Sequence, residues 1–265
     1  MEAGGGKFLS TKSMIVDGEE AFDNGGPGLW YDSQNKNAVV RNSSFHDNRE
    51  TGGGWEGIGL MFEISDGPLT MENCYSGYND GVELLIAESF GVTATGNTLD
   101  GAIEFRDMDD RGAMHVQNVR ITNNKLYNFT IYTTLGADDW SKATVTERNI
   151  VIDSNQWIGD QPQMKWGNDT HWYQGLDDIR SNLGLCMNDT WTADDPSGVS
   201  KFRAGNPFSP LSARAPVRVF DVLGRGIGVL PAIGVGTSQV RAFRSGAYVM
   251  RQGNTTRGVC RVNAK

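Results

Sequence analysis

The stretch GPGLWYD at 26–32, followed by NAVVRNSSFHDN at 37–48 and LMFEISDGP at 60–68, decides how the rest of the chain is organised. Each of these segments has an apolar strand pattern that closes on a carboxylate, an Asn or a turn. The apolar runs of the first and third segments end at Asp32 and Glu63. We interpret the segments as consecutive coils of one solenoid, and we predict that Asp32 and Glu63 occupy equivalent points of neighbouring coils.

The same plan recurs further along the chain. A large apolar residue closes each run, and successive ones lie 23 to 31 residues apart: Phe22, Phe45, Tyr75, Leu99, Leu126 and Trp157. The residues before them alternate between apolar and polar, a period of two that is typical of strands. One coil of a parallel β-helix plus variable loop insertions accounts for this spacing. The sequence therefore predicts an all-β fold with a parallel β-helix over residues 1–180.

A polar residue precedes each closing apolar residue by two positions. These residues are Glu20, Ser43, Asn73, Asn97, Asn124 and Asn155. An Asn at a coil corner can bond the equivalent amide one coil on, about 4.8 Å away. Asn also tolerates the left-handed backbone that a corner requires. We therefore predict a ladder of stacked Asn side chains at one corner.

Three insertions interrupt the repeat, at 49–55, 106–113 and 135–143, and they are candidate walls of a cleft. The second insertion carries an acidic cluster of Asp107, Asp109 and Asp110, whose oxygens are a candidate Ca²⁺ site. A Ca²⁺-dependent polysaccharide lyase would use such an ion, with Arg106, Arg111 or Lys125 as base. The alternative is a solvated loop, and no other cofactor is expected.

Charge, hydrophobicity and cysteine spacing argue against several classes of binding partner. The formal net charge of −8 argues against nucleic acid. No apolar run reaches the roughly 18 residues of a transmembrane helix, so we expect no membrane span. Cys74, Cys186 and Cys260 show no metal-ligand spacing and no disulfide framework, which predicts unpaired thiols.

The acidic pair is the sharpest functional signal. In adjacent coils the carboxyl groups of Asp32 and Glu63 would lie roughly 5–6 Å apart, close to the about 5–5.5 Å of retaining glycosidases. One carboxyl would then act as acid and the other as nucleophile. The candidate substrate-binding residues around the pair are Trp30, Tyr31 and Phe62 as aromatic surface, with Glu2 and Lys7 from the preceding coil. For Glu2 and Lys7, an exposed salt bridge is the alternative.

At these residues the sequence resembles the secreted right-handed parallel β-helix proteins related to pectate lyases. GLWYD followed by FEISDGP is similar to the motif pair of glycoside hydrolase family 120, the β-xylosidases. The resemblance implies Asp32 as nucleophile, Glu63 as acid/base, and Glu2 as a match to a further acidic residue. It implies a carbohydrate substrate. A non-catalytic carbohydrate-binding β-helix, the lyase, or a stacked acidic ladder without chemistry are the alternatives.

The C-terminal part has a different pattern. NPFSP at 206–210, VRVFDVLGR at 217–225, SGAYVMR at 245–251 and the terminal Lys265 resemble the C-terminal sorting domain of type IX secretion. The resemblance implies a small antiparallel β-sandwich over 206–265, after a linker or cap at 181–205, and an export machine as partner. It implies a secreted or cell-surface protein. MEAGGGKFLS at 1–10 has no signal-peptide core, so we expect a chain that lacks its original N-terminal part.

Overall fold

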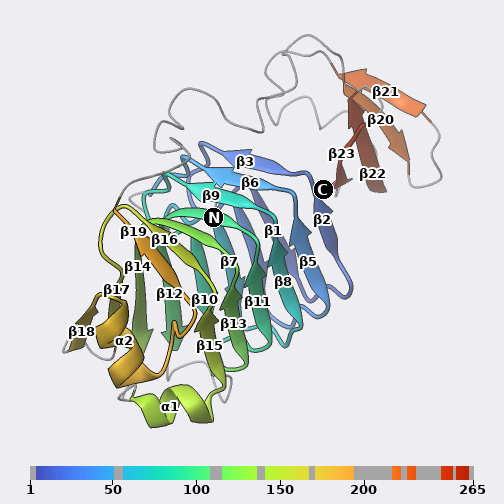
Figure 1. Cartoon of the computed structure of the whole chain (residues 1–265). Helices are drawn as coiled ribbons and strands as arrows, with labels where there is room; N and C mark the ends of the chain where they lie inside the picture. Colours follow the sequence, from blue (N-terminus) through green and yellow to red (C-terminus); the bar gives the residue numbers. More distant parts are fainter. Residues whose placement is uncertain are drawn as a thin grey trace. The chain divides into compact units, whose positions relative to one another are not determined.

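The computed structural model describes residues 4–50, 56–107, 115–135, 141–166 and 171–193, together with four strands between residues 217 and 262 (Figure 1). The chain divides into two compact units. The first is built mainly from residues up to Pro196, and the second mainly from Ser197–Lys265.

The first unit is a stack of coils in which equivalent strands of successive coils pair in parallel (Figure 1). One face of the stack, called the main face below, is formed by β1 (Gly6–Leu9), β4 (Leu29–Asp32), β7 (Leu60–Glu63), β10 (Leu84–Ala87) and the later parts of β12 (Thr98–Asp107) and β14 (Lys125–Leu135). A second face consists of β2 (Ile15–Asp17), β5 (Ala38–Arg41), β8 (Leu69–Glu72), β11 (Val92–Thr95), β13 (Val119–Thr122) and β15 (Ile150–Asp153). The predicted parallel β-solenoid is thereby confirmed.

A third face is formed by β3 (Glu20–Phe22), β6 (Ser44–His46), β9 (Tyr75–Gly77), the first parts of β12 and β14, β16 (Gln156–Ile158) and β19 (Thr190–Thr192). Because β12 and β14 continue from this face into the main face, the two faces form one hydrogen-bonded sheet. Strand β19 continues the stack within 181–205, where the sequence predicts a linker or cap.

Three further elements lie late in the first unit. The antiparallel hairpin of β17 (Gln163–Trp166) and β18 (His171–Gln174) extends the main face beyond β14. Helix α1 (Lys142–Glu147) begins at the N-cap Ser141, whose side chain accepts a hydrogen bond from the Thr144 backbone N–H. Helix α2 (Leu176–Leu183) ends at Gly184, whose φ of 70° suits a residue without a Cβ.

The core is the interior of the coils. On the main face, alternate residues point inward, and they stack in two buried columns: Leu29, Leu60, Leu84, Ile103 and Ile131 in one, and Tyr31, Phe62, Ile86 and Phe105 in the other. Because apolar side chains stack on apolar side chains, each coil buries the apolar edge of its neighbour.

An amide ladder runs along the corner between the second and third faces. Asn97 donates to Asn124 and Asn124 to Asn155, each at 3.0 Å, and the Asn155 backbone N–H donates to Asp189 at 2.8 Å. The predicted ladder is confirmed for these three Asn residues. The prediction for Asn73 is wrong, because Cys74 occupies the ladder position in that coil. The backbone N–H of Cys74 donates to Asn97.

The residue before each ladder position has the left-handed backbone that turns the corner. These residues are Asn42, Asn73, Gly96, Asn123 and Ser154, with φ between 50° and 68°. Asn73 therefore serves the turn and not the ladder. An Asn suits both positions for different reasons, so the residue type alone did not distinguish them.

The second unit contains an antiparallel sheet of four strands in the order β21-β20-β22-β23. The strands are β20 (Val217–Asp221), β21 (Gly226–Leu230), β22 (Gly246–Gln252) and β23 (Thr255–Val262). The NPFSP segment lies outside the described residues, and the four described strands form one sheet, so the β-sandwich stays a prediction.

Candidate functional site

The main face presents two columns of outward-pointing side chains, because its inward positions are taken by the core. Register places Lys7, Trp30, Met61, Leu85, Glu104, Tyr132 and Lys165 in one column, and Leu9, Asp32, Glu63, Ala87 and Arg106 in the other. All the polar groups of the candidate site described below come from these two columns or pack on them.

Asp32 and Glu63 are direct neighbours in adjacent parallel strands, as predicted. Asp32 of β4 pairs with Glu63 of β7. Neighbouring strands lie about 4.8 Å apart, so both carboxyl groups leave the sheet from the same side within reach of one ligand. Glu63 is buried, whereas the Asp32 side chain keeps 14% of its surface exposed.

Lys7 and Trp30 link the two carboxylates to one another. The Lys7 Nζ lies 2.7 Å from Asp32 Oδ2 and 3.5 Å from the centre of the Trp30 ring. The Trp30 Nε1 donates a hydrogen bond to Glu63 Oε2 at 3.0 Å. Asp32 is therefore paired with a cation, and Glu63 accepts from a neutral donor. The two carboxylates lie side by side in different electrostatic surroundings.

The corner after each of these strands is held by a separate polar stack. The Asn35 Nδ2 donates to the backbone oxygen of Asp32 at 2.8 Å and to Ser65 Oγ at 3.2 Å. The Ser65 backbone N–H in turn donates to Ser89 Oγ at 3.0 Å. These bonds fix the main chain at the ends of β4 and β7, and so they fix the points from which the two acidic side chains project.

The predicted aromatic surface for a sugar ring is wrong. Tyr31 and Phe62 point into the coil interior, where they are fully buried and pack on one another with ring centres 5.4 Å apart. Trp30 points outward, but it too is buried, with Lys7 over its ring. In LWYD the period-two alternation puts Trp30 and Asp32 on one side and Tyr31 on the other, so the sequence held the signal for this distinction.

The other predicted site residues have different outcomes. Lys7 lies at the acidic pair, bonded to Asp32. Glu2, Asp109 and Asp110 lie outside the described residues. Asp107 is buried and its Oδ2 is paired with Arg148 and, at 3.2 Å, with His115 Nδ1. Within the described ranges, no group of three or more His, Cys, Asp and Glu side chains is arranged to hold a metal ion.

A second charged cluster on the main face was missed by the sequence analysis. Arg106 bonds Glu104 through Nε at 2.7 Å and Nη2 at 2.8 Å, and the same Nη2 lies 3.0 Å from Glu56. The Tyr132 hydroxyl donates to Glu104 at 3.3 Å. Burial lowers the pKa of Arg106, but the two carboxylates outweigh it and leave that pKa raised. The alternation in EFR at 104–106 could have predicted this cluster, because it places Glu104 and Arg106 on the same side of the strand.

Between the two clusters the main face is closed. Trp30, Ile58, Met61, Val82, Leu85 and Ala87 form a buried apolar cluster on its outer side, with Ala102 and Tyr132 packed against it. A ligand that extends from the acidic pair across this part of the face would therefore pass over covered apolar side chains.

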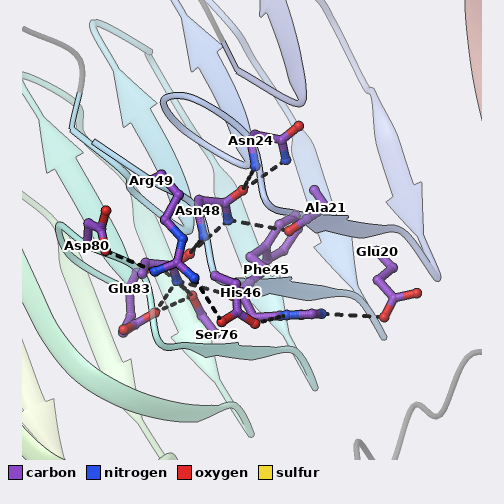
Figure 2. A network of polar contacts seen from close by, with 12 residues as sticks. Glu20, Ala21, Asn24, Phe45, His46, Asn48, Arg49, Ser76, Asp80 and Glu83 are labelled. Carbon is purple, nitrogen blue, oxygen red and sulfur yellow. Dashed lines mark hydrogen bonds and ion pairs between the residues drawn. The ribbon is translucent and has the colours of Figure 1, made fainter. Parts of the chain in front are cut away.

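Another polar network lies at the corner between the third and main faces (Figure 2). Asn24 donates to Asn48, Asn48 donates to Asn79, and Asn79 donates to Glu83, which also accepts from Ser76 at 2.8 Å. Glu83 ends this ladder because β12 continues through the corner in the next coil. There Gly101 has a φ of 150°, and a Cβ on it would lie 2.5 Å from Glu83 Oε1.

Burial raises the pKa of Glu83 to about 8, against hydrogen bonds from Asn79 and Ser76 that lower it. On the outside of the same corner, the His46 ring lies 3.4 Å from Glu20 through Nε2 (Figure 2). Its Nδ1 lies 2.7 Å from Asp47, and the ring stacks on Phe22 with ring centres 5.3 Å apart. The hydrogen bond to Glu20 is the largest reason why the pKa of His46 is raised. Neither group contacts the Asp32–Glu63 pair in any described interaction.

Comparison with known families supports the fold. The family model described as the right-handed β-helix region matches residues 1–99. This match and the parallel coils together support a right-handed β-helix fold for the first unit. No curated protein and no solved structure matches the chain. None of the helices in the described part is both long and apolar enough to span a bilayer.

Proposed function

We propose that this right-handed β-helix protein is an extracellular carbohydrate-active enzyme, a retaining glycoside hydrolase of the β-xylosidase type acting on plant-type polysaccharide or oligosaccharide. The observation that carries the proposal is the pairing of Asp32 with Glu63 in adjacent strands on an outward face. The two carboxyl groups of retaining glycosidases lie about 5–5.5 Å apart, close to the about 4.8 Å between neighbouring strands. The right-handed β-helix is also common among carbohydrate-active enzymes.

In the proposed reaction, Asp32 is the nucleophile and Glu63 is the acid/base. Glu63 gives a proton to the leaving glycosidic oxygen while Asp32 forms a covalent bond to the anomeric carbon. Glu63 then takes a proton from water, which attacks the same carbon and releases Asp32. Two displacements return the original configuration, and both residues regain their starting protonation states.

The partners of the two carboxylates fit these separate roles. Lys7 offsets the negative charge of Asp32, which suits the residue that must attack as a carboxylate. Trp30 donates to Glu63 Oε2 and so fixes the orientation of the carboxyl group that would exchange a proton. Because Trp30 is itself held beneath Lys7, its role is to orient Glu63 and not to stack on a sugar.

The test compares Asp32→Ala with Glu63→Ala on natural and activated substrates. Asp32→Ala removes the nucleophile, so hydrolysis should fall by several orders of magnitude on every substrate. Glu63→Ala should affect the glycosylation step of an activated aryl glycoside less, since a good leaving group needs little protonation. Azide should rescue Glu63→Ala with a product of retained configuration, and Asp32→Ala with an inverted product.

A matched control is Asp66→Ala, which removes a carboxylate of the same coil that pairs with Lys36 outside the two columns. It should leave turnover unchanged. Full activity in both Asp32→Ala and Glu63→Ala would make the pair a scaffold feature. Products that absorb in the ultraviolet through a new double bond would indicate a lyase, and binding without turnover would indicate a non-catalytic module.

We also propose that residues 206–265 direct export through type IX secretion, which would place the protein outside the cell or at its surface. The proposal rests on the motif set NPFSP, VRVFDVLGR and SGAYVMR, and the antiparallel strand pairing within this segment is compatible with it. Deletion of 206–265 should abolish surface delivery and leave the solenoid folded and active. A deletion that unfolds residues 4–193 would assign the segment a structural role.

A further inference from the structure

The hairpin β17–β18 carries an exposed tryptophan next to a lysine. Trp172 keeps 50% of its surface exposed. It pairs directly with Lys165 across the two antiparallel strands, and the Lys165 Nζ lies 5.6 Å from the centre of the indole ring. Gln163 and the exposed Gln174 form another directly opposed pair of this hairpin. The surface is thus an aromatic ring among polar groups, unlike the contiguous apolar patch of a protein interface.

Strand register places Trp172 on the same side of the sheet as the acidic pair. Residues that pair directly across neighbouring strands share a face. The series from Met61 through Leu85, Glu104, Tyr132 and Lys165 to Trp172 is continuous in the register of the sheet. Met61 lies two residues before Glu63 in β7, on the same outward side. Figure 1 shows the hairpin beyond β10, β12 and β14, the strands that follow β7 in the sheet.

The distance between the two places sets the size of ligand that could contact both. Five strand-to-strand steps separate β7 from β18, which is about 24 Å at the usual spacing. Met61 and Leu85, which lie between them, are buried in the closed apolar cluster. A small glycoside at Asp32 and Glu63 would not reach Trp172, whereas a chain of several sugar residues would.

We propose that Trp172, with Lys165, forms a remote binding platform for a polysaccharide chain whose cleavable linkage lies at Asp32 and Glu63. This inference rests on the proposed function and narrows its substrate class to polymers and long oligosaccharides. The indole offers a flat apolar face for the C–H groups of a sugar ring. The Lys165 ammonium next to it is a donor for ring hydroxyl or carboxylate oxygens.

The experiment measures binding and turnover separately, with soluble xylan as polymer and an aryl xyloside as small substrate. Binding is measured in the Asp32→Ala background, by retardation in gels containing xylan. Trp172→Ala should weaken xylan binding roughly tenfold, and Trp172→Phe should restore part of it. With Asp32 intact, Trp172→Ala should raise KM for xylan and leave kcat/KM for the aryl xyloside unchanged.

Phe22→Ala is the matched control, because Phe22 is an equally exposed aromatic residue on the third face. It should leave xylan binding unchanged. Equal retardation of Trp172→Ala and its parent, or an equal loss in Phe22→Ala, would overturn the inference, as would no retardation of the parent. Loss of xylan binding in Trp172→Ala together with an Asp32-intact parent that cleaves no glycan would uphold the platform and reject the hydrolase.

Discussion

Asp32 and Glu104 are both outward carboxylates of the main face, and their surroundings differ in a way that separates chemistry from scaffold. Asp32 is paired with Lys7 through Oδ2, accepts from Ser33 Oγ through Oδ1 at 2.8 Å, and remains partly exposed. Glu104 is 1% exposed and accepts from two nitrogens of Arg106 and from Tyr132. Both carboxylates are engaged by donors, but only Asp32 keeps exposed surface at which a substrate can contact it. The Arg106 cluster therefore serves the fold, whereas Asp32 has access to a ligand.

The largest effect on stability should come from Arg106→Met. This change leaves Glu104 buried without its cation, which costs about 3–5 kcal/mol because an unpaired buried charge is strongly destabilising. Urea unfolding followed by circular dichroism measures it. The matched variant is Lys7→Met, where the partner Asp32 is partly exposed and the expected cost is about 0–1 kcal/mol. Equal costs for the two variants would remove the distinction between the two carboxylates.

Asn97→Ala tests whether a neutral buried network behaves like the Arg106 cluster. The change removes the amide that accepts from the Cys74 backbone N–H and donates to Asn124 and to the Met71 backbone oxygen, so each of these buried groups loses one hydrogen bond. A loss of about 1–3 kcal/mol in the free energy of unfolding is expected.

Asn73→Gly is the control for Asn97→Ala, because Asn73 is exposed at the left-handed turn where Gly is equally suited. It should change stability by no more than about 0.5 kcal/mol, as is usual for an exposed position. A larger loss in Asn73→Gly than in Asn97→Ala would place the ladder at the wrong residue.

Glu83 extends the comparison to a buried carboxyl for which the structure describes hydrogen bonds from Ser76 and Asn79 and no ion pair. Its pKa is raised from 4.5 to about 8, so the folded protein binds a proton that the unfolded chain releases. Stability should be greatest below about pH 4.5 as far as this group is concerned, and should fall as pH rises towards 8, by at most about 1.4 kcal/mol per pH unit.

Glu83→Gln should flatten this pH dependence, because a neutral amide can still accept from Ser76 and Asn79. Thermal unfolding between pH 5 and pH 8 compares the two proteins. If the parent and Glu83→Gln lose stability in parallel over this range, Glu83 is ionised in the fold and the buried-acid interpretation is wrong.

Two predictions failed for an identifiable physical reason. Tyr31 and Phe62 were assigned to the substrate because they adjoin the acidic residues in sequence, yet successive residues of a strand point to opposite sides. Asn73 was assigned to the ladder because the spacing to the closing apolar residue varies by one between coils. In both cases the segment was correctly predicted as a strand or a corner. The direction in which each side chain points was decided by strand register, which residue type does not reveal.

The sequence by itself determined the repeat, the strand and turn alternation, three of the four Asn residues predicted for the ladder, and the pairing of Asp32 with Glu63. Each of these depends on local period and coil length. It could not determine which charged residues are enclosed. Glu56 and Arg106 are 50 residues apart, and Trp172 reaches the main face through a hairpin that carries no repeat signal. Only the tertiary structure decides such contacts, since burial and partner choice depend on how separate coils and their insertions pack over the same face.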